Sequence, residues 1–236
     1  MAARRRSDER RRLTSLKGYV AMKVNELKLY QSSGSPNSRR VRIFLAEKGI
    51  CMPMVPVDLG AKEQFSEAYA VINPRRVAPT LMLADGTAIA EVPAILRYLE
   101  DVYPEPPLYG TQPAERALTT MWERQMELEG FAPVMEAVRN GAASLKQRAI
   151  AGPHAYEQIP TLIERGRLRV GNFCQDLDAR LASSPFVAGN RFSAADITAV
   201  VTIDFATKAL ELPIPPERGS LRRWYELVSA RASMSA

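Results

Sequence analysis

Apolar and polar positions follow two different patterns, one in each half of the chain. In the first half, short apolar runs alternate with amphipathic helical stretches in the order strand, helix, strand, helix, strand, strand, helix. In the second half the pattern is helical throughout. We therefore expect an α/β domain over residues 25–106 and an all-helical domain over residues 113–236, joined by a linker at 107–112 that follows the prolines at 104 and 106.

Turn and cap signals bound the expected elements. We expect strands at about 26–30, 54–57, 80–83 and 87–89, and helices at about 36–48, 58–70, 91–103, 113–140, 161–183, from 193, and 221–230. Asp85-Gly86 is typical of a hairpin turn, and Pro56 favours an edge position for the second strand. Ser193 and Asp196 have the spacing of a capping box at the start of a helix.

The positive charge is confined to one end of the chain. The formal net charge is +6. Residues 1–23 contain eight basic and two acidic residues, a net +6, so the remainder sums to zero. We expect residues 1–24 to be a disordered basic arm, with a tether to RNA or to an anionic membrane as the alternative. A body that binds nucleic acid is not supported, and no apolar run is long enough to predict a membrane span.

Cysteine and histidine are scarce. Cys51 and Cys174 form no CxxC pair and indicate no disulfide framework, which fits a reducing compartment. His154 is the single histidine of the sequence, so a site with several histidine ligands is excluded, and we expect no bound metal. We expect His154 itself to lie at the surface.

The turn at Ser35-Pro36 carries the most chemistry. It joins the first strand to the first helix, so a hydroxyl there faces the positive end of a helix dipole, where anions are stabilised. Ser35 is either only a helix cap or also a group that holds a substrate anion. One hydroxyl can do both, because it has one donor and two acceptor sites. Ser32, Ser33 and Ser38 are rivals for the same role.

Several motifs together resemble the soluble glutathione transferases. They are Leu29-Tyr30 with Ser35-Pro36 and Arg40-Val41; Asn73-Pro74 with Pro79 and Leu81; Asp85-Gly86 with Glu91, Ala94-Ile95 and Tyr98-Leu99; and Phe192-Ser193 with Ala195-Asp196-Ile197. The resemblance covers about residues 25–235, and serine-type bacterial members look closest. It implies a thioredoxin-like N-terminal domain, an all-helical C-terminal domain, glutathione as co-substrate and a cytosolic homodimer.

The resemblance also implies a set of site residues. Ser35 would hydrogen-bond the glutathione sulfur. Ala78 and Pro79 would be joined by a cis peptide bond whose backbone meets the tripeptide. Glu91 would pair with the free ammonium of glutathione, and the N–H of Val92 would hold the γ-glutamyl carboxylate at a helix N-terminus.

The chain departs from the family pattern at Ala78, Val92 and Arg76. Ala78 replaces the Val that usually precedes the Pro, but its backbone groups are unaffected. Val92 replaces the usual Ser or Thr, which removes a hydrogen bond to a carboxylate. Arg76 stands where the family often has Gly. Either it forms a solvated loop pair with Arg75, or its guanidinium reaches a glutathione carboxylate and offsets that loss. Ser35 and Ser38 replace both cysteines of a thioredoxin CxxC, so the reactive thiol must come from the ligand. Asp196 resembles a structural capping residue.

The expected function is therefore that of a glutathione transferase, a detoxification enzyme that activates the glutathione thiol for attack on an apolar electrophile. Tyr30, Trp122 and Met126 belong either to the electrophile site or to the core. The alternative is a non-catalytic binding or assembly module with the same fold. Disulfide exchange is disfavoured because Ser35 stands where it would need a cysteine.

Overall fold

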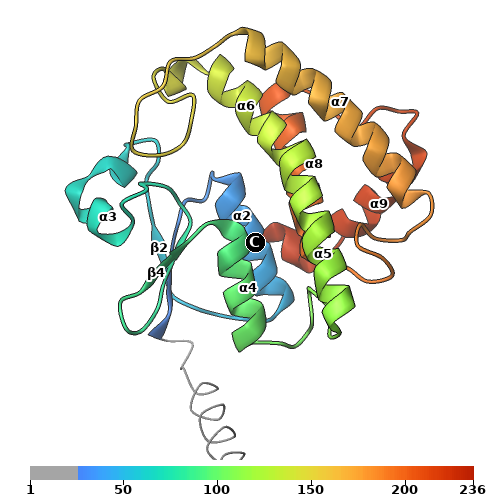
Figure 1. Cartoon of the computed structure of the whole chain (residues 1–236), viewed down its shortest axis with the longest axis horizontal. Coiled ribbons are helices and arrows are strands. Elements are labelled where there is room, and N and C mark those ends of the chain that lie inside the picture. The colour runs from blue at the N-terminus through green and yellow to red at the C-terminus, as the bar shows by residue number, and fades with distance from the viewer. Residues whose placement is uncertain (1–25) are drawn as a thin grey trace, which may run out of the picture.

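The computed structural model describes residues 26–236, so the basic arm predicted for residues 1–24 lies outside the described residues (Figure 1). Four strands form one mixed sheet in the order β2-β1-β3-β4. They are β1 (Lys28–Gln31), β2 (Met54–Pro56), β3 (Thr80–Met82) and β4 (Ala88–Ala90). β1 pairs with β2 in parallel and with β3 antiparallel, and β3 pairs antiparallel with β4. This is the sheet expected of a thioredoxin-like domain.

Local signals set the edges of the sheet as the sequence predicts. β2 lies at one edge of the sheet. Pro56 is tolerated there because an edge strand does not need every backbone N–H for pairing with a neighbour. At the other edge, β3 and β4 form the predicted hairpin, with Leu81 opposite Ile89. The Asp85 carboxylate accepts the Thr87 N–H at 2.8 Å and stabilises the turn.

Three α-helices accompany the sheet within the described residues: α2 (Pro36–Glu47), α3 (Glu67–Ile72) and α4 (Val92–Val102). The helix predicted over 58–70 is wrong in detail. A turn and a short 3₁₀ segment precede α3, because Lys62 has a left-handed φ of 61° that interrupts helical geometry. The Ser66 hydroxyl then accepts the Tyr69 N–H at 3.1 Å and starts α3.

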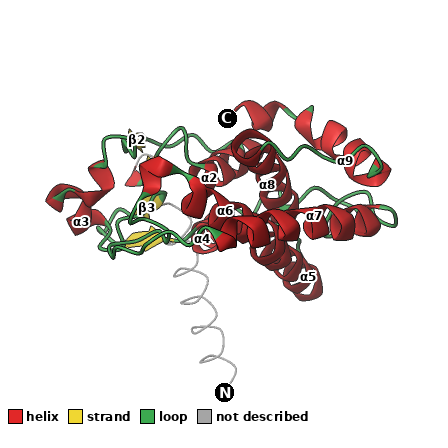
Figure 2. Ribbon diagram, turned by 90° about the horizontal axis from the view of Figure 1, so that it is seen from above, coloured by secondary structure: helices red, strands yellow, loops and turns green. Residues whose placement is uncertain are grey.

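The second half of the described chain is helical. Its helices are α5 (Pro113–Gln125), a π-helical segment (Met126–Phe131), α6 (Ala132–Gly141), α7 (Thr161–Leu181), α8 (Ala194–Leu210) and α9 (Gly219–Ser229). Short 3₁₀ turns follow α6 and end the chain. Figure 2 shows α3 and the sheet at one end of the molecule and α5, α7 and α9 toward the other.

The helix predicted over 113–140 contains a π-helical segment that the apolar periodicity does not reveal. Gly130 lies in this segment, and a Cβ built there would come within 2.6 Å of the Phe173 ring of α7. α7 therefore approaches the segment at a distance that only glycine permits.

A buried capping box starts α8, as the sequence predicts. Asp196 is fully buried and accepts hydrogen bonds from the Ser193 N–H at 3.0 Å and the Ser193 hydroxyl at 2.8 Å. Its other oxygen accepts the Val187 N–H and the Trp224 indole N–H, both at 2.9 Å. These hydrogen bonds lower the pKa of Asp196, but the burial of the carboxyl group raises it by more, to about 6. The residue joins α8 to α9 and has a structural role.

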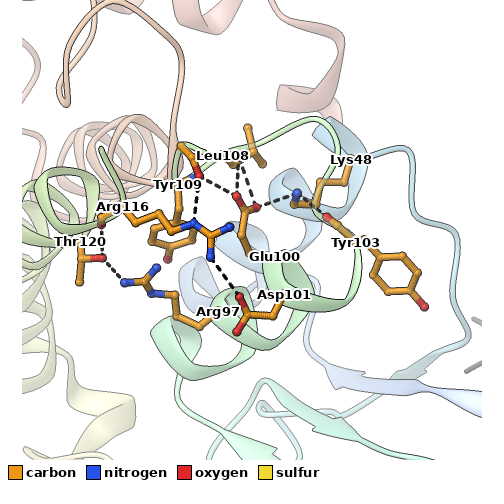
Figure 3. Close-up of polar contacts among 10 residues, drawn as sticks. Lys48, Arg97, Glu100, Asp101, Tyr103, Leu108, Tyr109, Arg116 and Thr120 are labelled. Carbon is orange, nitrogen blue, oxygen red and sulfur yellow. Dashed lines mark hydrogen bonds and ion pairs between the residues drawn. The ribbon is translucent and has the colours of Figure 1, made fainter. Parts of the chain in front are cut away.

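A buried ion pair ties the connection between α4 and α5 to the first domain (Figure 3). Lys48 Nζ lies 2.7 Å from Glu100 Oε2 and donates to the Tyr103 carbonyl oxygen at 2.7 Å. Glu100 also accepts the N–H groups of Leu108 and Tyr109, each at 3.0 Å. The predicted domain limits at 107–112 stay a prediction, although this segment does connect the two parts.

The remaining composition-based expectations concern single side chains. Cys51 is exposed, Cys174 is buried, and both are free thiols. His154 is exposed, as predicted. Within residues 26–236, no helix combines the length and the apolar content that a membrane crossing requires.

Candidate active site

A cavity of about 360 Å³ is lined by residues of both halves of the chain. All six site residues expected from the sequence line it: Ser35, Arg76, Ala78, Pro79, Glu91 and Val92. They come from the start of α2, the loop before β3 and the start of α4. The π-helical segment, α6, the loop after α6, and α8 supply the opposite wall.

Ser35 is both the cap of α2 and part of the cavity wall. Its hydroxyl oxygen accepts the Ser38 N–H at 3.3 Å, which leaves the hydroxyl proton available to another acceptor. Of the four serines considered in this part of the described chain, Ser35 alone lines the cavity. Ser38 is fully buried, and its hydroxyl accepts the Ser32 N–H at 3.2 Å. The geometry favours Ser35 over its neighbours.

The loop before β3 is held by side chains beneath it. The Ala78-Pro79 peptide bond is cis, as expected. The Tyr69 hydroxyl and the Asn73 amide donate to the Val77 carbonyl oxygen at 2.7 and 2.9 Å. These bonds fix the backbone that leads into Ala78, whose own peptide groups border the cavity.

Glu91 and Val92 lie where β4 passes into α4. Glu91 is the N-cap residue, with an exposed side chain and a φ of 68°, a value that non-glycine residues rarely adopt. Val92 is the first residue of α4, so its N–H has no acceptor within the helix. A carboxylate side chain and a helix N-terminus thus border the same part of the cavity.

The two adjacent arginines differ in their contacts. Arg76 has a φ of 54°, in the region where the family often places glycine. Its guanidinium donates to the Phe65 carbonyl oxygen at 2.5 Å and lies 3.3 Å from the Glu67 carboxylate. Arg75 is exposed at the cavity, and its side chain forms no hydrogen bond or ion pair with residues 26–236.

The helical wall is mostly apolar. Phe131, Met135, Val138 and Phe205 line it, and the rings of Phe131 and Phe205 lie 6.0 Å apart. These residues were not singled out by sequence reasoning. Their signal was present only as apolar positions on helices, which is the same signal that core residues give.

Three aromatic or methionine side chains considered for this wall do not line the cavity. Tyr30 packs edge-on against Tyr69. The Trp122 ring lies 4.5 Å from the Arg180 guanidinium, and Met126 is buried in the core. All three therefore belong to the packing around the site and not to the site itself.

A buried charge cluster behind the cavity was also missed. The Arg40 side chain is fully buried, donates to Asn37 at 3.3 Å and to Glu127 at 3.4 Å, and lies 3.6 Å from Glu123. Asn37 and Glu127 line the cavity, so Arg40 supports its floor. Burial raises the pKa of the Glu123 carboxyl. Arg40 precedes the apolar residue Phe44 by one helical turn, which places both on the same face of the helix and could have indicated that Arg40 is buried.

No group of three or more His, Cys, Asp or Glu side chains in the described part of the chain is arranged to hold a metal ion.

Comparison with known proteins agrees with this geometry. The model of the glutathione S-transferase N-terminal domain matches residues 29–107, and that of the C-terminal domain matches residues 160–227. The chain belongs to the glutathione S-transferase family. Glutathione S-transferase 2 of Saccharomyces cerevisiae is 30% identical over 224 residues, which cover 87% of each chain. The match is thus not confined to one domain.

Two further similarities refine what the family membership means. The crystal structure of a glutathione S-transferase domain-containing protein from Marinobacter aquaeolei superposes with a TM-score of 0.81 at 34% identity, over 88% of this chain and 99% of that one. The maleylacetoacetate isomerase of Rattus norvegicus is 32% identical over 80% of this chain and 89% of its own. Family membership therefore supports a glutathione-dependent transferase or a related activity.

Proposed function

We propose that the protein is a glutathione transferase in which Ser35 stabilises the thiolate of bound glutathione for attack on an apolar electrophile. The observation that carries the proposal is the placement of the Ser35 hydroxyl, which lines the cavity at the start of α2 with its proton uncommitted. The product is a thioether, and no covalent intermediate on the protein is needed.

The energies are of the right size for this role. A free thiol with a pKa of about 8.5 is only about 3% ionised at pH 7, and lowering that pKa by about two units requires about 2.7 kcal/mol. A hydrogen bond to a charged group contributes about 1.5–3 kcal/mol. The helix N-terminus adds about 0.3–1 kcal/mol. Ser35 and the start of α2 together account for the shift.

The other residues would hold the tripeptide. Glu91 would pair with the ammonium group, and the Val92 N–H would donate a hydrogen bond to the γ-glutamyl carboxylate at the start of α4. The backbone of Ala78, before Pro79, would meet the cysteinyl part of glutathione. Arg76 would reach a carboxylate, which requires its guanidinium to keep donors free beyond its contacts with the Phe65 carbonyl and Glu67.

The second substrate would occupy the helical wall. Phe131, Met135, Val138 and Phe205 offer it an apolar surface opposite Ser35. We also propose that the protein acts in the cytoplasm and forms a homodimer, as members of this family usually do. The exposed apolar side chains Leu118 and Met121 of α5 are candidates for burial in that dimer.

A non-catalytic module with the same fold is the second candidate. It is favoured by Val92, which lacks the hydroxyl expected at this helix start, and by the Arg76 guanidinium, which already has two partners. In such a module the cavity would bind glutathione weakly or not at all.

A glutathione affinity column and a conjugation assay with a generic aryl halide separate the two. Retention together with turnover is the expected result, and Ser35→Ala should reduce turnover while Ser33→Ala, at an exposed position that does not line the cavity, should not. A protein that is neither retained nor active would contradict the proposal and favour the module.

A further inference from the structure

Two arginines of the helical half, one that lines the cavity and one beside it, have no counter-ion among residues 26–236. Arg139 of α6 lines the cavity. Arg148, in the loop between α6 and α7, places its guanidinium 4.0 Å from the ring centre of Phe65, another lining residue. Within residues 26–236, neither guanidinium forms an ion pair or donates a hydrogen bond to a protein acceptor.

Parts of both guanidinium groups are also shielded from solvent. Arg139 Nε and Arg148 Nη1 are buried donors without a protein acceptor, which is an unfavourable arrangement for a charged group. Burial and the nearby charge of Arg148 both lower the pKa of the Arg139 guanidinium. An anion that contacted both side chains would relieve the missing hydrogen bonds and the repulsion at once.

The loop that carries Arg148 reaches from the helical half back to the first domain (Figure 1). Gly152 of this loop lines the cavity, and a Cβ built on it would lie 4.0 Å from the Arg75 carbonyl oxygen. Backbone hydrogen bonds between Gln147 and Tyr156 and between Tyr156 and Ala149 hold the loop closed. The backbone of this loop therefore holds Arg148 beside the lining residue Phe65.

This inference rests on the proposed function, in which the charged groups of glutathione bind residues other than Arg139 and Arg148. Glu91, the Val92 N–H and Arg76 border the cavity from the first domain, and between them they match one ammonium and two carboxylates. Arg139 belongs to the opposite wall, together with the apolar side chains Met135 and Val138. Arg148 does not itself line the cavity, but it lies near enough for its charge to act on Arg139. The arginine pair is left for the second substrate.

We propose that Arg139 and Arg148 bind a carboxylate of the electrophile, so that the second substrate is an acid with an apolar body. The apolar part would lie on Met135 and Val138, with the acid group at the loop. Guanidinium groups match the planar geometry of a carboxylate. Arg139 lies in the last turn of α6, where the helix dipole disfavours a doubly charged group such as a phosphate more than a singly charged one.

Binding of ready-made conjugates tests this without requiring turnover. Calorimetric titration would compare S-methylglutathione, S-(4-carboxybenzyl)glutathione and the neutral isostere S-(4-carbamoylbenzyl)glutathione. The full-length protein should bind the acid about 10- to 100-fold more tightly than the amide, as expected for charge-assisted hydrogen bonds. Arg139→Gln and Arg148→Gln should each remove most of that preference and leave S-methylglutathione affinity unchanged.

Arg222→Gln, at an exposed position of α9, is the matched control and should keep the full preference. Arg148 lies in a loop, so its variant tests the proposal even if Arg139→Gln fails to fold. Equal affinity of the acid and the amide for the unmodified protein would overturn the inference.

Two other outcomes would also overturn it, and they are distinguishable. If Arg139→Gln and Arg148→Gln weaken every glutathione derivative alike, S-methylglutathione included, the pair binds the glycyl carboxylate of glutathione instead. If the unmodified protein binds no S-methylglutathione, the proposed function itself fails and the inference fails with it.

Discussion

The hydroxyl oxygen of Ser35 accepts the backbone N–H of Ser38 at 3.3 Å while the same side chain lines the cavity between the two halves of the chain. The bond occupies one lone pair of the oxygen and orients the side chain. The hydroxyl proton is then available to an anion at the start of α2, where the helix dipole adds to its effect. One serine can therefore cap the helix and stabilise a thiolate.

Arg76→Ala is expected to weaken glutathione binding tenfold or more. The proposed role of the guanidinium is to replace the hydrogen bond lost at Val92, worth about 1.5–3 kcal/mol. Calorimetric titration with glutathione measures the change. Arg75→Ala, at the neighbouring lining position, is the comparison. A larger effect of Arg75→Ala would transfer the role to Arg75, and no effect of either would show that both are solvated surface residues.

Gly130→Ala is expected to destabilise the protein by about 1–3 kcal/mol, because the new methyl group would overlap the buried Phe173 ring. Gly171→Ala in α7 is the matched control, since a Cβ there meets nothing within 4 Å. That substitution should instead be stabilising by up to about 1 kcal/mol through helix propensity. Urea unfolding of the three proteins measures both changes, and equal stability of the two variants would contradict the close approach of α7.

Asp196 should give the stability of the protein a pH dependence of known sign. Its pKa is about 6 in the folded state against 3.8 for the free side chain, so between these values the folded state binds more protons than the unfolded state. The free energy of unfolding contributed by this group therefore falls as the pH rises through this window. The total change is about 3 kcal/mol.

The comparison with Asp196→Asn isolates this effect, since asparagine does not titrate. The variant is destabilised overall, because its amide N–H₂ would face the Ser193 N–H. Unfolding in urea between about pH 4 and pH 7 should show the unmodified protein losing stability relative to the variant as the pH rises. A constant difference across that range would contradict the raised pKa.

Much of the fold could be predicted because its signals are local. The Asp85-Gly86 turn, the edge position of Pro56 and the capping box at Ser193 each depend on residues a few positions apart. The resemblance to a family added the cis bond before Pro79, which local sequence alone would not indicate.

The rest depends on contacts between distant segments. Phe173 of α7 lies close to Gly130 in the π-helical segment, and the apolar periodicity of a single helix indicates neither this contact nor the π-helical geometry. The buried Arg40 side chain faces Glu123 of α5 and Glu127 of the π-helical segment, which are distant from it in the sequence. A second cis peptide bond, between Glu105 and Pro106, was not indicated by any feature of the sequence.

The candidate site also has one part that local sequence predicts and one part that depends on contacts between distant segments. The six expected residues come from three turns of the first domain, whose form could be predicted from the turns themselves. The helical wall depends on how α6 and α8 are placed relative to those turns. Apolar periodicity could not separate Trp122, which packs outside the cavity, from Phe131 and Phe205, which line it.

The most direct test of the central claim is the pH titration of the thiolate absorbance of glutathione bound to the protein, compared with the same titration of Ser35→Ala. If Ser35 stabilises the thiolate, the substitution should raise the midpoint by roughly one to two pH units, the equivalent of one charge-assisted hydrogen bond. Ser33→Ala should leave the midpoint where it is. A midpoint that Ser35→Ala does not move would contradict the claim.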